Sequence, residues 1–487
     1  MSIKNTQTKN VLVTGYFDVL HPGHVRLLKF AKDCGNQLTV AITADNTKKG
    51  LGRVDEKHRL EMVQSLQFVD YAFITPLTPY QLVTEHQPWA VVKGKEFETE
   101  DNPEKEALSE YGGKLIFGSG EFDFISDQIQ LPLHKIGRSF DYEGLAEYAE
   151  RHKINFTSLL PYFSKIKTLN VGVIGEIIVD EYVQGTAIGL SQEDPTIVMT
   201  PNKTDTFLGG AAITAGHLKS IGAEKVSLFS VLGVDEHANY TKNNINNYQL
   251  QSFLFNDESR PTPLKTRYRA DKKTLLRVNK VRQHKISLEL QESLFSAIEN
   301  NIDQFDILVF SDFNYGVLPQ ALVERITQLC HKNNVKIIAD SQTSSQVGDI
   351  SRYRNTFLMT PTEKEVRVAL NNPDDGLVIL AKKLCEKSKP KNLVITLASE
   401  GVFIHIPTID GSSWVNDKIP AINKNAADPA GAGDCFLATS SLFMAVGATP
   451  WQAFYVASIA AACQVDTLGN TPLLHNVLLN TVKASFE

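Results

Sequence analysis

Two histidines near the start of the chain have a spacing suited to phosphate chemistry. His21 and His24 are three residues apart in VTGYFDVLHPGHVRLLKFAK, where a short apolar run gives way to a helical pattern. Residues three apart can share one face of a helix. The N-terminus of a helix offers free N–H groups and the positive end of the helix dipole. We therefore expect the turn to bind phosphate, with both imidazoles stabilising charge on the reacting group; the alternative is two histidines without a chemical role.

A glycine-rich turn near the other end of the chain is suited to a second phosphate. In AADPAGAGDCFLA, Gly431, Ala432 and Gly433 precede a long helical stretch. Small residues let backbone N–H groups converge on an anion, and the helix dipole adds to the attraction. Asp434 follows directly, where its carboxylate can accept a proton from a hydroxyl that attacks a γ-phosphate. The alternative is an ordinary loop-to-helix turn.

A basic segment lies between these two turns in the sequence. PLKTRYRADKKTLLRVNK carries Lys265, Arg267 and Arg269 at a spacing of two, which places them on one face of a strand. Arg277 follows on the expected return strand. The segment is either a clamp for an anionic sugar phosphate or the solvated basic face of a hairpin, and both interpretations stay open.

The elements that must position the first turn alternate between strand and helix. Strand-like segments separated by helical ones are typical of a parallel sheet with helices on both faces. The expected strands are residues 11–15, 38–43, 71–75, 89–93 and 114–117, and the expected helices run to about residue 34 and over 57–66.

The second turn belongs to a larger α/β unit that opens with a strand at Leu169. The unit is mixed at first, with the alternating segments TIVMT and KTRYRA, and then becomes regular; its later strands are expected at 307–311, 336–340, 357–360 and 393–396, before a helical end from Gly433. The stretch between the two units is helical and amphipathic. The sequence therefore predicts one domain over 1–135, a helical connector over 136–167 and a second domain over 168–487.

Length and composition exclude several classes of protein. At about 100–200 residues per domain, 487 residues require at least two domains. The net charge of -6 argues against a nucleic-acid partner. No apolar run approaches the roughly 18 residues of a membrane span, and the start lacks a signal-peptide pattern. Five scattered cysteines without CxxC spacing predict neither disulfides nor zinc and fit a cytoplasmic location.

The segment TGYFDVLHPGH, residues 14–24, resembles the cytidylyltransferase-like nucleotidyltransferases, whose HxGH turn binds the nucleotide triphosphate. TADNT, RVDEKHR and VVKGKEF extend the likeness, which is closest to the adenylyltransferase half of bifunctional heptose-phosphate enzymes. The resemblance implies a Rossmann-like domain in which His21 and His24 are catalytic and Asp18 lies near the sugar phosphate or ribose. The nucleotide contacts it implies are Thr14, Gly15, Phe17, Lys48, Arg59, Lys93, Gly94 and Ser126. One departure is Asp127, which replaces a hydroxyl residue after Ser126.

The region from Leu169 to Glu487 resembles the ribokinase-like sugar kinases, and its closest likeness is to heptose 7-phosphate kinases. GEIIVD, LGGAA, SDFNYG, TPTEKE and GAGD carry the likeness. It implies an α/β domain with a small β lid that also forms a homodimer, and MgATP as the phosphoryl donor. Asp434 would be the catalytic base, Gly431, Ala432 and Gly433 would bind nucleotide phosphates, and Glu365 would organise magnesium. The implied substrate-binding residues are Asp180, Gly209, Gly210, Lys265, Arg267, Arg277 and Asp312.

Several positions depart from the kinase pattern. Ile213 stands where these kinases usually have a sugar-binding Asn, Tyr315 and Gln342 stand where Lys is usual, and Thr362 replaces the Asn that partners Glu365. In addition, Glu176 replaces an Asp. Each exchange changes a polar contact or a charge in a site that handles phosphates.

The leading hypothesis is a bifunctional enzyme of nucleotide-activated sugar synthesis. The kinase would phosphorylate the anomeric hydroxyl of a sugar phosphate similar to heptose 7-phosphate, and the transferase would couple the sugar 1-phosphate to a nucleotide and release pyrophosphate. The transferase comes first in this chain, the reverse of the heptose enzymes. In one alternative only the N-terminal domain is active and the kinase-like half serves binding or dimerisation. In another the substrates are a pentose or alditol phosphate and CTP.

Overall fold

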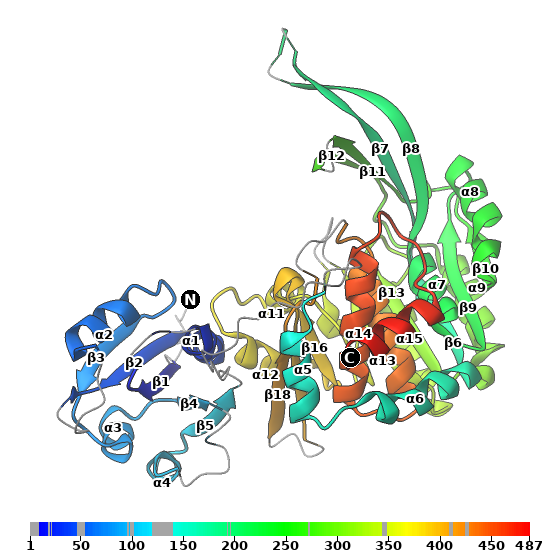
Figure 1. The fold of residues 1–487 in the computed structure, drawn as a ribbon. Coiled ribbons are helices and arrows are strands. Elements are labelled where there is room, and N and C mark those ends of the chain that lie inside the picture. Colours follow the sequence, from blue (N-terminus) through cyan, green and yellow to red (C-terminus); the bar gives the residue numbers. More distant parts are fainter. Residues whose placement is uncertain are drawn as a thin grey trace, which may run out of the picture. The chain divides into compact units, whose positions relative to one another are not determined.

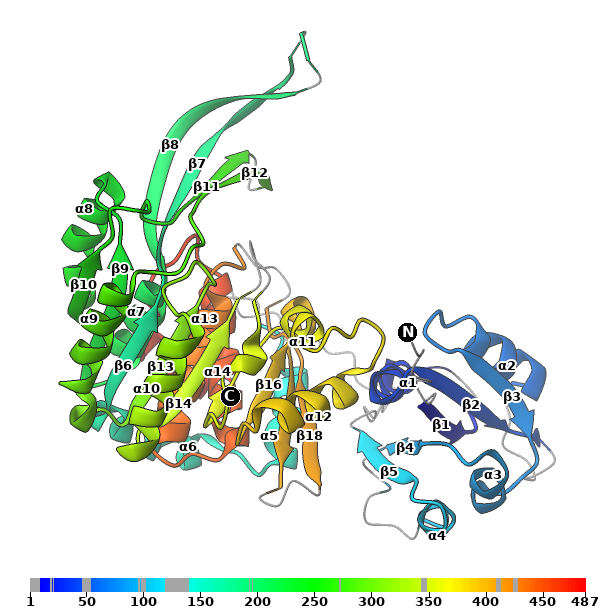
Figure 2. The ribbon, with the colours of Figure 1, turned by 180° about the vertical axis from the view of Figure 1, so that it is seen from behind.

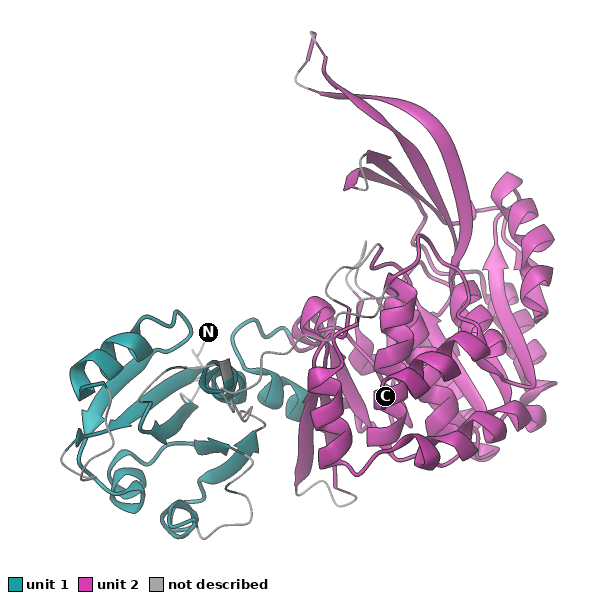
Figure 3. Cartoon of the chain, in the orientation of Figure 1, with its two compact units in different colours: residues 1–134, 371–383 teal, residues 135–370, 384–487 magenta. Residues whose placement is uncertain are grey.

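The computed structural model describes most of the chain, and its contacts divide the chain into two compact units. The described residues are 9–17, 20, 22–45, 54–94, 97, 102–118, 140–191, 193–194, 196–270, 273–342, 348–408, 413–423 and 428–487. Unit 1 comprises residues 1–134 and 371–383, and unit 2 comprises residues 135–370 and 384–487 (Figure 3). Each unit is described below by itself.

Unit 1 is built on a five-stranded sheet in the order β3-β2-β1-β4-β5, with every neighbouring pair parallel (Figure 1). Its strands are β1 (Asn10–Gly15), β2 (Gln37–Thr43), β3 (Tyr71–Thr75), β4 (Ala90–Gly94) and β5 (Lys114–Gly118). Its helices before residue 134 are α1 (Pro22–Cys34), α2 (Glu56–Gln64), α3 (Pro79–His86) and α4 (Glu104–Ser109). The strand order reverses between β1 and β4, and in open α/β sheets ligands bind beyond the carboxyl ends of the strands at such a point.

Local sequence signals explain where the helices of unit 1 begin. Asp55 caps α2 by accepting hydrogen bonds from the backbone N–H groups of Lys57 and His58. Thr78 and Gln81 form a capping box at the start of α3, with Pro79 in the first turn. Helices α3 and α4 then bury their apolar faces on the sheet through one cluster, which contains Leu12, Ala41, Leu82, Val83, Val91, Ala107 and Leu108.

Unit 2 contains a nine-stranded sheet in the order β10-β9-β6-β13-β14-β15-β16-β17-β18, parallel as far as β16 and antiparallel beyond it. The strands are β6 (Asn170–Gly175), β9 (Lys225–Leu232), β10 (Gln251–Asn256), β13 (Ile307–Asp312), β14 (Lys336–Ser341), β15 (Leu358–Met359), β16 (Leu393–Thr396), β17 (Val402–Pro407) and β18 (Trp414–Ile419). The strand order reverses between β6 and β13, which marks the second ligand-binding edge.

Helices cover both faces of this sheet. Figures 1 and 2 show α7, α13 and α14 on one face and α9 and α10 on the other. The helices after residue 168 are α7 (Ala211–Ile221), α8 (Glu236–Asn244), α9 (Leu288–Glu299), α10 (Gln320–Lys332), α11 (Glu363–Leu370), α12 (Leu377–Ser388), α13 (Ala432–Ala445), α14 (Pro450–Val465) and α15 (His475–Ala484). The predicted parallel α/β architecture is therefore present in both units.

A separate four-stranded sheet forms the predicted lid. Its order is β12-β11-β7-β8, with strands β7 (Ile177–Leu190), β8 (Ile197–Gly210), β11 (Leu264–Ala270) and β12 (Lys273–Lys280). β7 and β8 have 14 residues each and form a hairpin that projects from the body of unit 2 (Figure 1). The basic segment is thus a hairpin of β11 and β12, and β11 pairs with β7 in parallel.

The predicted connector is helical, but its helices belong to the core of unit 2. They are α5 (Glu143–Arg151) and α6 (Phe156–Lys165). Leu145, Tyr148, Leu159 and Phe163 are buried in the same hydrophobic cluster as the sheet strands and α13. The amphipathic pattern that suggested a connector therefore reflects packing on the kinase-like body rather than a free-standing link.

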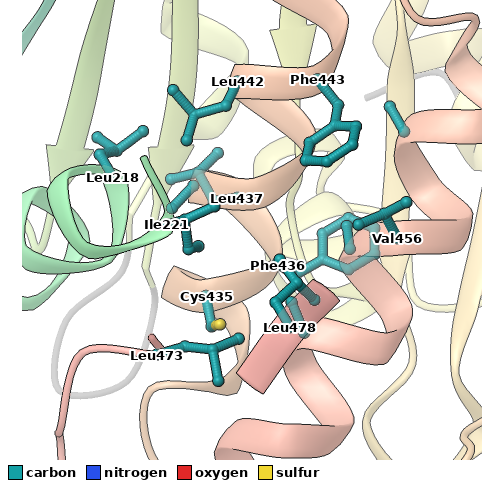
Figure 4. Packing of buried hydrophobic residues seen from close by; sticks show 14 of the residues in the cluster. Leu218, Ile221, Cys435, Phe436, Leu437, Leu442, Phe443, Val456, Leu473 and Leu478 are labelled. Carbon is teal, nitrogen blue, oxygen red and sulfur yellow. The ribbon is translucent and has the colours of Figure 1, made fainter. Parts of the chain in front are cut away.

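Helix α13, which carries the glycine-rich turn at its start, is held by the densest part of this core. Figure 4 shows its side chains, among them Phe436, Leu437 and Phe443, packed between residues of α7, α14 and α15. A site built on such a helix is held more rigidly than one on a loop. All five cysteines are free thiols. In the described part of the chain, no helix has the length and apolar character needed to cross a bilayer.

Candidate functional sites

The first candidate site lies where β1 ends and α1 begins. Thr14 and Gly15 are the last two residues of β1, and α1 starts at Pro22. Phe17 has a left-handed backbone, with φ of 51°, and its ring lies 5.1 Å from the His24 ring, centroid to centroid. This ring contact places the imidazole of His24 against Phe17 in the first turn of α1.

The neighbouring strand places a lysine at the same edge of the sheet. Lys93 and Gly94 end β4, which pairs with β1 at the point where the strand order reverses. Lys93 Nζ lies 3.0 Å from Glu104 Oε1 and 5.1 Å from the centroid of the Phe97 ring. Glu104 is buried, so Lys93 is anchored within unit 1 next to the expected nucleotide site.

Arg59, a predicted nucleotide contact, is held by partners within unit 1. Its side chain is fully buried, and its guanidinium donates to the backbone carbonyls of Val54, Tyr16 and Thr43 and pairs with Asp45. It therefore holds the segments after β1 and β2 together at the edge where phosphate would bind. Sequence alone could not reveal this, because the surroundings of a side chain depend on the fold.

Four predicted residues of the first site lie outside the described residues. They are Asp18, His21, Lys48 and Ser126.

The second candidate site centres on Asp434 in the first turn of α13. Gly431 caps this helix with φ of 77°, a conformation that favours glycine, and Ala432 and Gly433 are its first two residues. Asp434 is buried, and Thr214 Oγ1 of α7 donates a hydrogen bond to its Oδ1 at 2.8 Å. Burial raises the pKa of Asp434 to about 6, and Thr214 and the charge of Lys265 partly oppose this rise.

Lys265 brings a buried positive charge toward Asp434. It lies on β11, and burial lowers its pKa to about 8, which the charge of Asp180 partly opposes. Its Nζ lies 4.8 Å from the centroid of the Phe313 ring and 5.7 Å from that of Tyr315. At position 315, where similar kinases have a lysine, this chain therefore has a ring beneath the ammonium group of Lys265.

Asp180 joins the lid to the body of unit 2. Arg267 Nη1 forms an ion pair with its Oδ1, and Asn470 Nδ2 donates to its Oδ2 at 2.8 Å. A Cβ atom at Gly209 would clash with Asp180 Oδ2, which explains this glycine. Gly210 has φ of 62° and passes against the carbonyl oxygen of Glu176, so it also excludes a side chain.

Arg277 lies opposite Arg267 in the β11–β12 register and is exposed. The positive charge of the lid thus comes from both strands of the predicted basic hairpin. Of the two neighbouring cations on β11, Lys265 is buried and Arg267 is partly buried against Asp180, whereas Arg277 faces solvent.

Asp312, a predicted sugar contact, is buried in a hydrogen-bond network. Its Oδ2 accepts hydrogen bonds from Arg352 Nη2 at 2.6 Å, Tyr353 OH at 2.8 Å and Ser341 Oγ at 3.0 Å. Beside it, Glu176 accepts hydrogen bonds from the backbone N–H groups of residues 313, 315 and 317. Burial, together with the charge of Asp312, raises the pKa of Glu176 to about 7. Glu176 and Asp312 thus hold the loop after β13, which carries the rings of Phe313 and Tyr315 next to Lys265.

Glu365, the predicted magnesium residue, forms a capping box at the start of α11. Thr362 N donates to Glu365 Oε2 at 2.8 Å, and Glu365 N donates to Thr362 Oγ1 at 3.2 Å. Thr362 is thus a helix cap at the position where an Asn was expected. Among the described residues, no group of three or more His, Cys, Asp or Glu residues is arranged to hold a metal ion.

Two residues of the second site were missed by sequence reasoning. Asp340 is the penultimate residue of β14. Burial, together with the charges of Glu365 and Asp434, raises its pKa well above the ordinary value. Its position at the carboxyl end of a parallel strand could have identified it. Asn470 has no such signal, because it lies in an irregular segment after α14.

Comparison with known proteins finds two families along the chain. The family described as pfkB family carbohydrate kinase matches residues 169–476, and the one described as cytidylyltransferase-like matches residues 12–118. The predicted order, transferase-like first and kinase-like second, is confirmed.

Curated relatives carry the name bifunctional protein HldE. The protein from Geotalea uraniireducens is 28% identical over 313 residues, covering 63% of this chain and 62% of its own length. The protein from Aliarcobacter butzleri is 29% identical over 308 residues, covering 62% of each. The chain therefore spans about three fifths of the length of these relatives.

Solved structures resemble unit 2. A ribokinase from Thermotoga maritima has a TM-score of 0.50 at 18% identity, covering 65% of this chain and 99% of its own. Phosphofructokinase-2 from Escherichia coli in complex with substrates and products has a TM-score of 0.52 at 15% identity, covering 66% and 99%. At these identities the likeness shows the fold alone, and it confirms the predicted ribokinase-like architecture.

Proposed function

Because the chain belongs to the pfkB family of carbohydrate kinases, we propose that unit 2 transfers the γ-phosphoryl group of ATP to the anomeric hydroxyl of a sugar phosphate similar to heptose 7-phosphate. Unit 1 then couples the sugar 1-phosphate to a nucleotide and releases pyrophosphate. The cytidylyltransferase-like match and relatives named as bifunctional proteins support the second activity. The two reactions fit one chain because the product of the first is the substrate of the second.

The observation that carries the kinase proposal is the environment of Asp434. A general base works best when its pKa lies near the working pH, since it is then ionised and still basic. The buried Asp434, with its pKa raised to about 6, meets this condition at neutral pH. It also follows directly on the Gly431–Gly433 turn, whose N–H groups and helix dipole suit the phosphates of ATP.

The acceptor side of the site supports an anionic sugar. At the base of the lid, Lys265 is buried and Arg267 is partly buried, and Arg267 pairs with the carboxylate of Asp180. A sugar phosphate offers hydroxyl groups to Asp180 and negative charge to the two cations. The exposed Arg277 on the next strand adds to the attraction for an anion.

The carboxylates near Asp434 fit a magnesium ion that is shared with the nucleotide. In phosphoryl-transfer sites Mg²⁺ is held by one or two carboxylates together with substrate phosphates and water. Burial raises the pKa of Asp340, the charge of Glu365 raises it further, and a divalent cation would relieve the repulsion between the two carboxylates. These two residues would hold the ion, which would neutralise charge on the transferring phosphates.

In unit 1, His24 at the start of α1 and Lys93 at the end of β4 occupy the edge where the strand order reverses. We expect them to hold the triphosphate together with His21 and the backbone at Thr14 and Gly15. ATP is the proposed nucleotide, and CTP is the alternative for this unit.

The proposal includes a homodimer that forms through the lid. The hairpin of β7 and β8 carries apolar side chains that are exposed near its far end; they are Ile188, Leu190, Ile197 and Val198. Exposed apolar patches of this kind are typical of protein interfaces.

A coupled assay of the full chain tests the function. It measures ADP and pyrophosphate separately with a panel of sugar phosphates and with ATP or CTP. We expect ADP formation that depends on one class of sugar phosphate. Asp434→Asn keeps an acceptor for Thr214 and removes the base, so it should lower ADP formation by about 100-fold or more, whereas Asp303→Asn, an exposed aspartate of the same unit, should not.

Two results would contradict this assignment. ADP formation that survives Asp434→Asn unchanged would place the base elsewhere. Wild-type protein that makes no ADP with any sugar phosphate, yet releases pyrophosphate when given sugar 1-phosphate, would establish the second candidate function. That candidate is an active transferase with a kinase-like binding unit, and it is favoured by Ile213, which is fully buried and offers no polar group to a sugar.

A further inference from the structure

One buried asparagine connects the acceptor side of the kinase site with the glycine-rich turn. Asn470 lies between α14 and α15 and is only 5% exposed. Its Nδ2 donates to Asp180 Oδ2 at 2.8 Å. A Cβ atom at Gly209 would lie 2.9 Å from the same Nδ2. The amide nitrogen therefore contacts Asp180 and lies close to Gly209, two residues that the proposed kinase uses to bind its acceptor.

The amide oxygen of Asn470 faces the other side of the site. A Cβ atom at Gly431 would lie 2.8 Å from Oδ1, so the oxygen points at the residue that caps α13, three positions before Asp434. Within the described residues this Oδ1 is buried and has no hydrogen-bond partner. Buried polar atoms are almost always hydrogen-bonded in native proteins, because leaving one unpaired costs free energy. The oxygen is therefore suited to accept a hydrogen bond from a bound molecule.

The backbone around Asn470 is fixed before any ligand arrives. Gly469 N donates to Asp428 Oδ2 at 3.2 Å, and Leu473 N donates to His217 Nδ1 at 3.1 Å. Gln464 Nε2 donates to the carbonyl oxygen of Gly469 at 3.2 Å. Burial lowers the pKa of His217 to about 3, so the imidazole stays neutral and remains an acceptor. Asn470 is thus held in place on both sides.

Space next to Asn470 has the character of a site for hydroxyl groups. Asn470 lines a cavity of about 130 Å³ whose wall combines polar and apolar residues: Thr206, Phe207, Leu208, Tyr240, Asn244, Asn247, Tyr248, Thr471 and Pro472. Amides and hydroxyls on a partly aromatic wall suit a molecule that carries several hydroxyl groups.

We propose that Asn470 binds the phosphoryl acceptor: a hydroxyl of the sugar donates to Oδ1 while Nδ2 holds Asp180 in position. This inference rests on the proposed kinase function of unit 2. A carboxamide can do both because it carries a donor and an acceptor on one rigid plane. In this chain position 213 of α7 carries a fully buried isoleucine and has no amide. The amide of Asn470, in the segment after α14, would take its place.

The test measures ADP formation by the full chain with the accepted sugar phosphate and with analogues that each lack one hydroxyl. In the wild type, removal of the hydroxyl that contacts Oδ1 should raise the acceptor KM about tenfold. Asn470→Ala should raise the acceptor KM by a similar factor and leave the KM for ATP within about twofold. In that variant, removal of the same hydroxyl should have no further effect, because the contact is already lost.

Two further variants separate binding from a purely structural role. Asn392→Ala removes another buried asparagine, whose Nδ2 donates to the Phe357 carbonyl oxygen at 2.9 Å, and it should leave the response to every analogue as in the wild type. Asn470→Asp keeps the shape but places a second carboxylate beside Asp180. Two carboxylates this close repel each other and displace Asp180, so the acceptor KM of this variant should exceed that of the wild type.

Each outcome decides the matter. Suppose that the wild type is active. If every analogue then changes the acceptor KM of the wild type and of Asn470→Ala by the same factor, the inference is wrong and the kinase function stands. The same conclusion follows if Asn470→Ala raises the KM values for ATP and for the acceptor together. If the wild type forms no ADP with any sugar phosphate, the proposed function fails and the role of Asn470 fails with it.

Discussion

At the scale of single residues, the proposed kinase site contains two buried ionisable groups, a carboxyl whose pKa is raised and an ammonium group whose pKa is lowered. Burial raises the pKa of the Asp434 carboxyl to about 6 and lowers that of the Lys265 ammonium to about 8. In the proposed reaction each acts in its charged form, Asp434 as the base and Lys265 as the cation near the acceptor. The two are ionised together only in the window between these values.

The pH dependence of kcat/KM for ADP formation should follow this window. The rate should rise as Asp434 loses its proton near pH 6 and fall as Lys265 loses its proton near pH 8. Lys265→Arg keeps the positive charge at all accessible pH values, so the alkaline limb should move beyond pH 9 or disappear. Lys203→Arg, on the exposed part of β8, is the matched control. An alkaline limb that is identical in the wild type and Lys265→Arg would assign it to another group.

At the scale of elements, the helix α5 is fastened to the kinase-like body by a buried cluster of polar and aromatic contacts. Arg151 and His152 both bind the carboxylate of Asp417 on β18, at 3.0 Å and 2.7 Å. The His152 ring stacks on Trp451 of α14 at 4.3 Å, and Tyr148 OH donates to the Trp451 carbonyl oxygen. These contacts explain why the predicted connector is an integral part of unit 2.

Loss of the Asp417 carboxylate should destabilise unit 2. Asp417→Asn leaves the partly buried Arg151 without its charged partner, and breaking a buried ion pair in this way costs about 3–5 kcal/mol. Urea unfolding of the full chain, followed through the transition of unit 2, measures the loss. Asp205→Asn is the control, because its pair with Lys203 is more exposed and should contribute less than about 1 kcal/mol.

The Asp417–Arg151 pair also predicts how the unfolding free energy of unit 2 changes at low pH. Burial opposes the charge on Asp417, but hydrogen bonds from His152 and Arg151 outweigh it and hold the pKa of the carboxyl below its ordinary value. A lowered folded-state pKa stabilises the fold above the ordinary carboxyl pKa, and that contribution is lost as pH falls through the lowered value. The difference in unfolding free energy between wild type and Asp417→Asn should therefore shrink below about pH 4. A difference that stays constant down to pH 2 would contradict this assignment.

At the scale of the whole molecule, each unit has its own sheet and its own phosphate-suited turn at a helix start. The proposed reactions should therefore separate by substitution. His24→Ala should lower pyrophosphate release by about 100-fold, comparable to the loss of one preorganised donor, and leave ADP formation unchanged. His86→Ala, an exposed histidine at the end of α3, should change neither. If His24→Ala slows both reactions equally, the two sites are not independent.

We expect the lid sheet to form the interface of the proposed dimer. Ile188 and Leu190 are each 67% exposed on β7, so Ile188→Glu with Leu190→Glu should convert the proposed dimer to a monomer. Sedimentation velocity measures this directly. Leu288→Glu is matched in exposure but lies at the start of α9, away from the lid sheet, and should leave the dimer intact. A wild-type protein that sediments as a monomer would refute the dimer.

The sequence by itself determined the parts whose chemistry depends on one turn or one repeating pattern. The Gly431–Asp434 turn and the His21–His24 pair are recognisable because a helix start needs only residues that are neighbours in the chain. The alternation of strand and helix predicted the parallel sheet of unit 1 and the parallel part of the sheet in unit 2, since a parallel connection requires a crossover. The spacing of Lys265 and Arg267 likewise placed both side chains on one face of a strand, and the lid sheet contains that strand.

Only the tertiary structure decided which polar groups meet and which are enclosed. Asp180 and Asn470 are 290 residues apart in the chain, so no local pattern could pair them. Arg59 and Asp312 have the types of residue that bind phosphates and sugars, yet the fold surrounds both with internal partners. The pKa of Asp434 depends on burial by helices from distant parts of the sequence. Burial and long-range pairing arise from how the elements pack together, and it is this packing that gives the local motifs their chemical character.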